Sequence, residues 1–472
     1  MKKKEIYLLV LLIIVSAVLR LSSLGYSHFY GDETKTLYLD KTISATDFLF
    51  GQRKGPVQFL VVWGVEKLTG GFNEQAVRFP FALAGLLSVG VFYILVKKIF
   101  TWREALVAST LFALSGFNIA FSRTAQYQSI LILVGLLSIF FIYQYSLASK
   151  HRYIYLMLGS VFLGISFLTH YDAVFFAIPC VFIFYKNARL TKINFKEILL
   201  FTLPCLVLLA AFYVPYIFNG NFANNTFNYL SRRASGDTYL PNNSIYTAKV
   251  YNPYLIGFIP LFFAFFFLLR PISWKKAIIF VWFIVPYILF EYLFRNPGTH
   301  INNYYLPLYI IASVGFVQVI DSLPKSFFRP LLNVGLIIIF IVYGFINTSV
   351  YLPGLRFGYP WHNGNIDKNY HLYLYGFPYY RAWDQVQAYF SETDGIRNFY
   401  TNDNNIIASY YLRKYDLTPP GTNYLPQYYV YIKDSQEFRE PSPEFLSSYS
   451  LEKEFQDALG IVLAQVYKLS LK

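Results

Sequence analysis

Residues 30–56 have the sequence YGDETKTLYLDKTISATDFLFGQRKGP and follow a long apolar N-terminal segment. An Asp-Glu pair, Asp32 and Glu33, lies near the start of this stretch, and a basic turn with Lys54, Gly55 and Pro56 lies at its end. Ionisable groups beside apolar segments are costly to place and usually have a function. We therefore expect the chemical groups of a membrane enzyme in this stretch.

The composition of the chain supports a membrane protein. Of 472 residues, 56% are hydrophobic and only 14% are charged, whereas about a quarter of residues are charged in soluble proteins. The net charge is +14, but the basic residues are scattered between apolar runs instead of forming one basic domain, so we expect no nucleic-acid partner. The two cysteines, Cys180 and Cys205, have no metal or redox spacing and are predicted to pack in the interior.

Apolar segments predict an all-α polytopic membrane domain. Ile6–Leu19 follows three lysines and is predicted to be an uncleaved first helix, which puts the N-terminus in the cytoplasm. Ten further segments have about the length that crosses a bilayer, which gives about eleven transmembrane helices. They lie near 79–96, 104–121, 127–146, 154–169, 172–187, 197–217, 253–270, 277–294, 303–320 and 329–349.

Charge gives a test of this topology, because cytoplasmic connections carry excess Lys and Arg. With eleven crossings, the basic connections after residues 96, 146, 187, 270 and 320 all fall on the side of Lys2–Lys4. The split at His170, between two short spans, is the critical step. If 154–187 were one helix, everything downstream would be inverted.

The first outer loop, residues 25–78, contains a shorter apolar segment. Pro56–Leu68 is too short to cross about 30 Å of hydrocarbon, and it begins with Pro and ends before Gly70-Gly71. It predicts an interfacial or re-entrant helix. The catalytic loop would thereby be held against the membrane.

The chain becomes polar and rich in Tyr after about residue 350. We therefore divide it into a transmembrane domain, 1–350, and a C-terminal domain, 351–472, which an odd number of spans places outside the cytoplasm. Residues 381–391 have a helical pattern, and residues 427–432 and 461–467 have strand patterns. These patterns predict a small extracytoplasmic α/β domain.

Cations gather at the predicted outer helix ends, where the positive-inside rule predicts few. An anionic ligand would account for them, and phosphate is the natural candidate because Arg and Lys bind phosphoryl oxygens. The alternative for each residue is that its cation anchors the chain at lipid headgroups. The residues are Arg20, Arg53, Lys54, Arg78, Arg123, His170, Arg232, Arg233, Arg295 and His300.

Two interpretations of the acidic pair remain open. Gly31-Asp32-Glu33-Thr34 before an apolar run is typical of a helix N-cap with an acidic first turn. A carboxylate beside a cation-rich pocket also suits a general base that takes a proton from an acceptor hydroxyl. Both hold if one of Asp32 and Glu33 caps while the other acts.

Three motifs resemble a known family. The Asp-Glu pair, RKGPVQFLVVW and EQAVRFPFALAGLLSVGVFYILVKKIF are similar, in order and spacing, to the GT-C glycosyltransferases of the protein O-mannosyltransferase and aminoarabinose-transferase (ArnT-like) superfamily, glycosyltransferase family 39. FSRTAQYQSILIL, SFLTHYDAVFFAIP and NNYYLPLY fit the family pattern more loosely. The resemblance implies a GT-C fold with juxtamembrane helices in the first outer loop.

The resemblance also implies roles for individual residues. Asp32 matches the catalytic aspartate and Glu33 the neighbouring acid. Lys54 matches the lysine that contacts the lipid phosphate, and the other matched positions are Arg78, Arg123, and Tyr304 or Tyr305 with Pro307. Gln128 stands where many relatives have Asp and His170 where several have Lys, so the second acid is in doubt. Arg78, Arg123, His170 and Arg295 are further candidates for binding the donor phosphate.

The implied reaction is glycosyl transfer from a polyprenyl-phosphate sugar at the outer face of the plasma membrane. Asp32 would deprotonate the acceptor hydroxyl of a glycan, lipid or protein, and Lys54 would stabilise the departing phosphate, with inversion at the anomeric carbon. No metal is required, although a divalent cation near Asp32 and Glu33 is possible in the family. The sequence leaves the sugar, the acceptor and the lipid length open.

A transporter or flippase for a polyprenyl-linked glycan is the competing interpretation. Transporters tend to place ionisable residues near the membrane midplane, on broken helices related by repeats. In this chain the charges are predicted at helix ends and no repeat is visible. A receptor would leave the Asp-Glu pair and the Lys-x-Pro turn unexplained.

Overall fold

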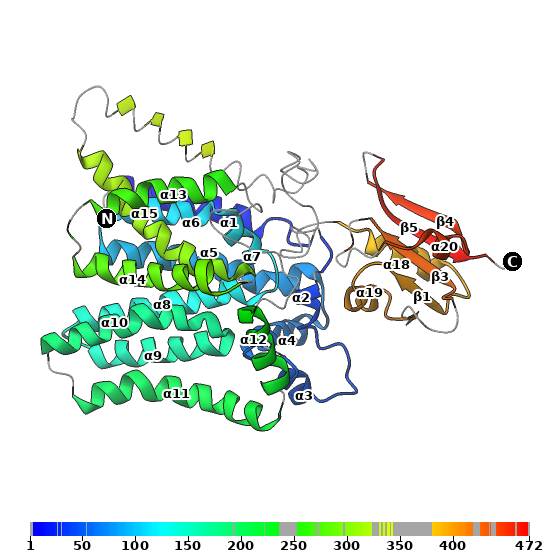
Figure 1. The fold of residues 1–472 in the computed structure, drawn as a ribbon, viewed down its shortest axis with the longest axis horizontal. Coiled ribbons are helices and arrows are strands. Elements are labelled where there is room, and N and C mark those ends of the chain that lie inside the picture. Colours follow the sequence, from blue (N-terminus) through cyan, green and yellow to red (C-terminus); the bar gives the residue numbers. More distant parts are fainter. Residues whose placement is uncertain are drawn as a thin grey trace.

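The computed structural model describes residues 3–322 and 380–470, with short gaps and a longer one at 236–252, and scattered residues between 330 and 342. A bundle of long helices forms one end of the molecule and a small domain with a sheet forms the other (Figure 1). The N-terminus lies at the end of the bundle that faces away from the sheet domain (Figure 1). Short helices lie between the two parts.

The bundle consists of long apolar helices. Six of the described helices are long and apolar enough to cross a membrane, and a bent pair would make a seventh. The predicted span 329–349 lies mostly outside the described residues, so the total of about eleven stays a prediction, as does the domain boundary at 350. The helices are α1 (Lys3–Leu21), α5 (Glu74–Ile99), α6 (Trp102–Ala113), α7 (Gly116–Ser122), α8 (Tyr127–Leu147), α9 (Arg152–Thr169), α10 (Val174–Thr191), α11 (Phe195–Phe218), α13 (Pro253–Leu268), α14 (Trp274–Ile288), continued by a π-turn (η3, Leu289–Leu293), and α15 (Asn302–Ser322).

The predicted break at His170 is confirmed. α9 ends at Thr169, His170 has an extended backbone, and a short 3₁₀ turn (η1, Tyr171–Ala173) leads into α10. The His170 side chain caps this turn by accepting from the Asp172 N–H. The chain therefore reverses between two separate helices, as the charge pattern required.

The predicted span 104–121 is not one straight helix in the structure, because the chain bends by 64° between α6 and α7, and whether the pair crosses the membrane as one span stays a prediction. The bend leaves carbonyl groups at the end of α6 without helical partners. Arg20 of α1 donates from Nη1 to the Ala113 carbonyl (3.0 Å), and Tyr309 of α15 donates to Ser115 Oγ in the turn (3.0 Å). Side chains of neighbouring helices thus stabilise the bend, and no local sequence pattern predicts it.

Ion pairs connect helix ends at the N-terminal side of the bundle. Lys97, in the last turn of α5, pairs with Glu5 in the first turn of α1. Arg103 of α6 pairs with Asp321 of α15 (2.7 Å), and Arg152 of α9 pairs with Glu197 of α11 (2.6 Å). Each pair joins residues at or beside predicted basic connections.

Short helices cover the opposite end of the bundle. They are α2 (Gly31–Thr34), α3 (Ala45–Phe50), α4 (Val57–Thr69) and α12 (Asn228–Ser235), which follows a π-turn (η2, Phe222–Phe227). The predicted short helix after Pro56 is confirmed as α4, with Pro56 at its N-cap and Gly70, in the left-handed conformation, at its C-cap. α4 packs on α5 and α9.

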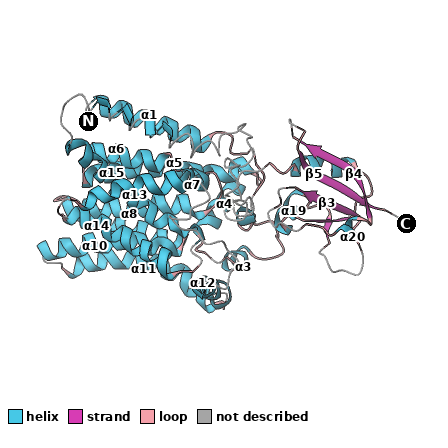
Figure 2. Cartoon of the chain, turned by 45° about the horizontal axis from the view of Figure 1, so that its top comes forward, coloured by secondary structure: helices cyan, strands magenta, loops and turns pink. Residues whose placement is uncertain are grey.

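The C-terminal domain is a five-stranded sheet with helices (Figure 2). The strand order is β2-β1-β3-β5-β4, in which β1 pairs in parallel with β2 and β3, while β3–β5 and β5–β4 are antiparallel. This confirms the predicted helix and both predicted strands. The elements are α18 (Trp383–Glu392), β1 (Asn398–Thr401), α19 (Asn405–Tyr411), β2 (Asp416–Leu417), β3 (Tyr428–Ile432), α20 (Pro443–Leu446), β4 (Tyr449–Gln456) and β5 (Val462–Leu469).

Candidate active site

A small pocket lies between α2, the turn before α4, and α4 itself. The helices α2 and α4 lie at the end of the bundle that faces the sheet domain (Figure 1). The pocket brings Asp32 and Lys54, which are 22 positions apart in the sequence, into one lining. A carboxylate and an ammonium group thereby share a site at the predicted outer end of the bundle. Its lining residues are Asp32, Lys35, Thr36, Gln52, Lys54, Gly55, Gln58 and Phe59.

Asp32 is the partly exposed member of the acidic pair. It is the second residue of the four-residue helix α2, and its side chain is 32% exposed. Lys35 Nζ donates to Asp32 Oδ1 (2.7 Å), and the lysine side chain is itself 45% exposed. An ion pair with this exposure is weak. Asp32 therefore stays accessible to a molecule that enters the pocket.

Glu33 is completely buried and is held by three donors. Arg78 donates from Nε to Oε1 and from Nη2 to Oε2, both at 2.8 Å, and the Ala125 N–H donates to Oε1 at 2.8 Å. Parallel contacts of this kind are the strong form of an Arg-carboxylate pair. The pair joins the catalytic loop to α5 and to the segment after α7. The structure thus assigns Glu33 a positioning contact.

Arg78 and Arg123 bind backbone carbonyls, and neither is among the residues that line the pocket. Beyond Glu33, Arg78 donates to the carbonyls of Leu24, Ser27 and His28 at 2.8–2.9 Å, so each guanidinium nitrogen has an acceptor. Arg123 donates to the carbonyls of Leu19, Ser22 and Ser23 at the end of α1. Both arginines fix the chain that leads into the pocket, and a role in phosphate binding stays a prediction.

Lys54 lies over an aromatic stack. Its Nζ is 4.5 Å from the centre of the Tyr127 ring, which is a cation–π distance, and Tyr127 stacks on His170 at 3.7 Å with the planes 6° apart. The next residue, Gly55, touches the end of α9, because a Cβ added there would lie 1.8 Å from the Leu168 carbonyl oxygen. Only glycine allows this approach, which brings Lys54 to Tyr127 and His170.

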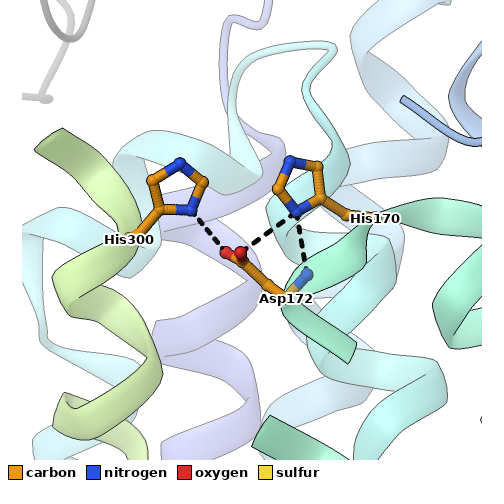
Figure 3. A group of neighbouring side chains, drawn as sticks. All are labelled: His170, Asp172 and His300. Carbon is orange, nitrogen blue, oxygen red and sulfur yellow. Dashed lines mark hydrogen bonds and ion pairs between the residues drawn. The ribbon is translucent and has the colours of Figure 1, made fainter. Parts of the chain in front are cut away.

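His170 is buried beside Asp172 and His300, and all three side chains point toward one another (Figure 3). His300 Nδ1 lies 2.7 Å from Asp172 Oδ2, and His170 Nδ1 lies 3.3 Å from Asp172 Oδ1. Asn303 donates from Nδ2 to Asp172 Oδ2 (2.9 Å). No local pattern predicts this group, because His300 is 128 positions from Asp172.

The remaining predicted site residues lie away from the pocket lining. Tyr304 and Tyr305 are buried in α15, where Tyr304 donates to Glu291 (2.5 Å) and Tyr305 lies against Tyr309. Arg295 is exposed after η3 and donates to the Ser235 carbonyl (3.3 Å). Arg53 lies outside the described residues.

The predicted divalent cation near Asp32 and Glu33 can be compared with the donor set. Both Glu33 oxygens accept hydrogen bonds from Arg78, and one accepts a third from the backbone. A cation held by both carboxylates would have to displace this guanidinium. The residues present therefore do not fit an ion shared between Asp32 and Glu33.

The C-terminal domain holds the segment before Asp32. Tyr411 accepts from the Phe29 N–H (2.8 Å), and Arg381 Nη2 donates to the Phe29 carbonyl (2.5 Å). His28 lies between the Arg381 N–H (3.1 Å) and the Asp384 carboxylate (3.1 Å). α19 also packs on α2. The segment that contains Asp32 is thus held between the bundle and the sheet domain.

Two solved structures have a fold similar to that of this chain. The fold matches the crystal structure of ArnT from Cupriavidus metallidurans bound to undecaprenyl phosphate, with a TM-score of 0.60, 15% identity and 97% coverage of both chains. It also matches the apo oligosaccharyltransferase of Archaeoglobus fulgidus, with a TM-score of 0.54, 12% identity, and coverage of 99% of this chain and 75% of the other. The fold is therefore the GT-C fold, as predicted.

Comparisons of the sequence show which glycosyltransferases the chain resembles. Residues 53–218 match the family model described as dolichyl-phosphate-mannose-protein mannosyltransferase. A putative mannosyltransferase of Bacillus subtilis (strain 168), YkcB, is 25% identical over 224 residues, which is 44% of this chain but only 30% of the relative's length. In fold and in part of its sequence, the chain is therefore similar to the GT-C glycosyltransferases of the protein O-mannosyltransferase and ArnT group.

Proposed function

We propose that this protein is a membrane glycosyltransferase that moves a sugar from a polyprenyl-phosphate donor to an acceptor hydroxyl at the outer face of the membrane. The observation that carries the proposal is the pocket shared by Asp32 and Lys54. Such a transfer needs a base for the acceptor and a cation for the leaving phosphate. The GT-C neighbours support the donor class, because one of them is described with undecaprenyl phosphate and another with a dolichol-phosphate and an inhibitory peptide.

Asp32 is the proposed general base. Its carboxylate takes the proton of the acceptor hydroxyl, and the oxygen forms a bond to the anomeric carbon as the bond from that carbon to the phosphate oxygen breaks. A single displacement inverts the anomeric centre. Glu33 is a poorer candidate, because it is completely buried and its oxygens accept from Arg78 and the Ala125 N–H.

Lys54 is the proposed phosphate ligand. An ammonium group stabilises the negative charge that develops on the departing polyprenyl phosphate. The packing of Gly55 on the Leu168 carbonyl and the ring of Tyr127 below the ammonium fix the place of the lysine. A change that moves this turn should therefore weaken donor binding.

The decisive experiment measures release of free polyprenyl phosphate. The protein in detergent is incubated with a panel of polyprenyl-phosphate hexoses and pentoses, with and without cell-envelope acceptors, and wild type is compared with Asp32→Asn and Lys54→Gln. We expect acceptor-dependent release that Asp32→Asn abolishes, and a raised KM for the donor in Lys54→Gln. Release that Asp32→Asn does not affect would refute the assignment of the base. Donor binding without any release would favour the flippase.

A further inference from the structure

Three metal-ligating side chains from separate elements meet in the interior of the protein. His170 follows α9, Asp172 lies in η1, and His300 lies in the 3₁₀ turn before α15 (η4, Gly298–Ile301). One ligand atom from each residue lies within 4.8 Å of the others. The side chains are only 1%, 6% and 8% exposed. Among the described residues this is the one group of His, Cys, Asp or Glu side chains with such spacing.

We propose that His170, Asp172 and His300 bind a divalent transition-metal ion, with zinc as the favoured ion. Two imidazoles and one carboxylate are a common ligand set for such ions. In a tetrahedral site with bonds near 2.0–2.1 Å, ligand atoms are about 3.3 Å apart. His170 Nδ1 and Asp172 Oδ1 are 3.3 Å apart, and His300 Nδ1 and Asp172 Oδ2 are 2.7 Å apart. Small side-chain rotations would therefore complete the geometry.

Hydrogen bonds hold the group together without an ion, and a metal would replace two of them. The Asp172 N–H donates to His170 Nδ1 (3.1 Å), and His300 Nδ1 is within hydrogen-bonding distance of Asp172 Oδ2. Binding at His300 Nδ1 would therefore require the ring tautomer that carries its proton on Nε2. The competing interpretation is a purely structural hydrogen-bonded triad, which the experiment below distinguishes.

Surrounding groups orient the ligands, as outer partners do in metal sites. Asn303 donates to Asp172 Oδ2 and to the His300 carbonyl, both at 2.9 Å. Tyr127 stacks on the His170 ring, and Phe290 stacks on the His300 ring at 6.0 Å. The ligands are thus held before any ion arrives.

Three protein ligands leave a coordination position for an oxygen ligand, either water or a phosphoryl group. The His170 ring is separated from Lys54 by the ring of Tyr127 alone. An ion here would therefore add positive charge beside the pocket. The metal site is inferred from the three ligand side chains alone, so it does not depend on the proposed glycosyl transfer.

The test is a metal-binding measurement on the full chain in detergent. Protein treated with a chelator is incubated with Zn²⁺, Mn²⁺ or Mg²⁺, passed through gel filtration and analysed by mass spectrometry for metal content. We expect about one zinc per wild-type chain and much less manganese or magnesium. Asp172→Asn and His300→Asn should lose the zinc. His151→Asn is the matched control, because His151 is exposed and has a left-handed backbone that asparagine tolerates.

A variant that keeps all three ligands guards against misfolding as the cause of a loss. Asn303→Ala should retain the fold, judged by gel filtration and circular dichroism, and should weaken zinc binding about 10–100-fold. Cobalt should replace zinc and give the visible absorption of a tetrahedral site. Wild-type protein without stoichiometric metal, or equal binding by wild type and the ligand variants, would overturn the proposal whatever the transfer assay shows.

Discussion

Arg78 holds Glu33 through two parallel hydrogen bonds of 2.8 Å in a site where the two side chains are 3% and 0% exposed. Asp32, the residue before Glu33, is paired with Lys35 in the lining of the pocket. Two adjacent carboxylates thus have opposite environments. The buried carboxylate fixes the loop, and the partly exposed one lines the pocket.

Replacing each carboxylate by its amide should separate these roles. Glu33→Gln leaves a buried guanidinium without its counter-charge, which costs about 3–5 kcal/mol. Asp32→Asn removes a partly exposed ion pair worth about 0–1 kcal/mol. Thermal unfolding in detergent should therefore show a lower midpoint for Glu33→Gln and a nearly unchanged one for Asp32→Asn. A stable Glu33→Gln protein that had lost transfer would instead place Glu33 in the chemistry.

Gly55 offers a test of the position of Lys54. A Cβ at this residue would lie 1.8 Å from the Leu168 carbonyl oxygen and 2.3 Å from its carbon, both backbone atoms that cannot move alone. We expect Gly55→Ala to displace the turn and raise the KM for the donor at least tenfold, with a lower unfolding midpoint. Gly64→Ala is the control, because nothing lies within 4 Å of a Cβ there and alanine favours the α4 helix by about 1 kcal/mol.

Local patterns were sufficient to predict several elements. The short apolar segment between Pro56 and Gly70 correctly predicted the helix α4. The positions of the basic connections correctly predicted that the chain breaks at His170. The helix and strands of the C-terminal domain followed from residue periodicity. In each case the signal lies within one segment of the chain, where side-chain pattern and end residues act directly.

The site could be predicted only in part, because its contacts join distant segments. The sequence placed Asp32 and Lys54 together only through the family resemblance, and it could not decide which carboxylate was buried. That depends on Arg78, 45 positions from Glu33. The meeting of Asp172 with His300 depends on the packing of α10, α14 and α15, and the bend between α6 and α7 on Arg20 and Tyr309.

The orientation of the chain in the membrane can be measured with cysteine labelling. Both natural cysteines, Cys180 and Cys205, are buried, so an introduced exposed cysteine gives a clear signal. With the N-terminus in the cytoplasm, an impermeant maleimide on intact cells should label Ser450→Cys, in the sheet domain, and should not label Ser149→Cys, between α8 and α9, until the cells are permeabilised. The reverse pattern would place the pocket on the cytoplasmic side.

The contact between His28 and the sheet domain should weaken in acid. The Arg381 N–H donates to Nδ1 (3.1 Å) and the Asp384 N–H donates to Nε2 (3.3 Å), while Nε2 also lies 3.1 Å from the Asp384 carboxylate. Protonation of Nδ1 would break the first of these bonds. Burial lowers the pKa of His28, and the positive charge of Arg381 lowers it further. The carboxylates of Asp384 and Glu74 oppose this effect but do not outweigh it.

The sign of the pH effect follows from this lowered pKa. The folded state binds fewer protons than the unfolded state, in which the pKa of His is about 6.5, so the stability contribution is complete above that pH and is lost as the pH falls. Burial works to raise the pKa of Asp384, but hydrogen bonds from His28 and Tyr380 outweigh it and hold this pKa at about 2. The carboxylate therefore stays ionised throughout. Between pH 7.5 and 5.0 we expect the unfolding midpoint of wild type to fall further than that of His28→Gln. Equal falls would show that another group carries the pH dependence.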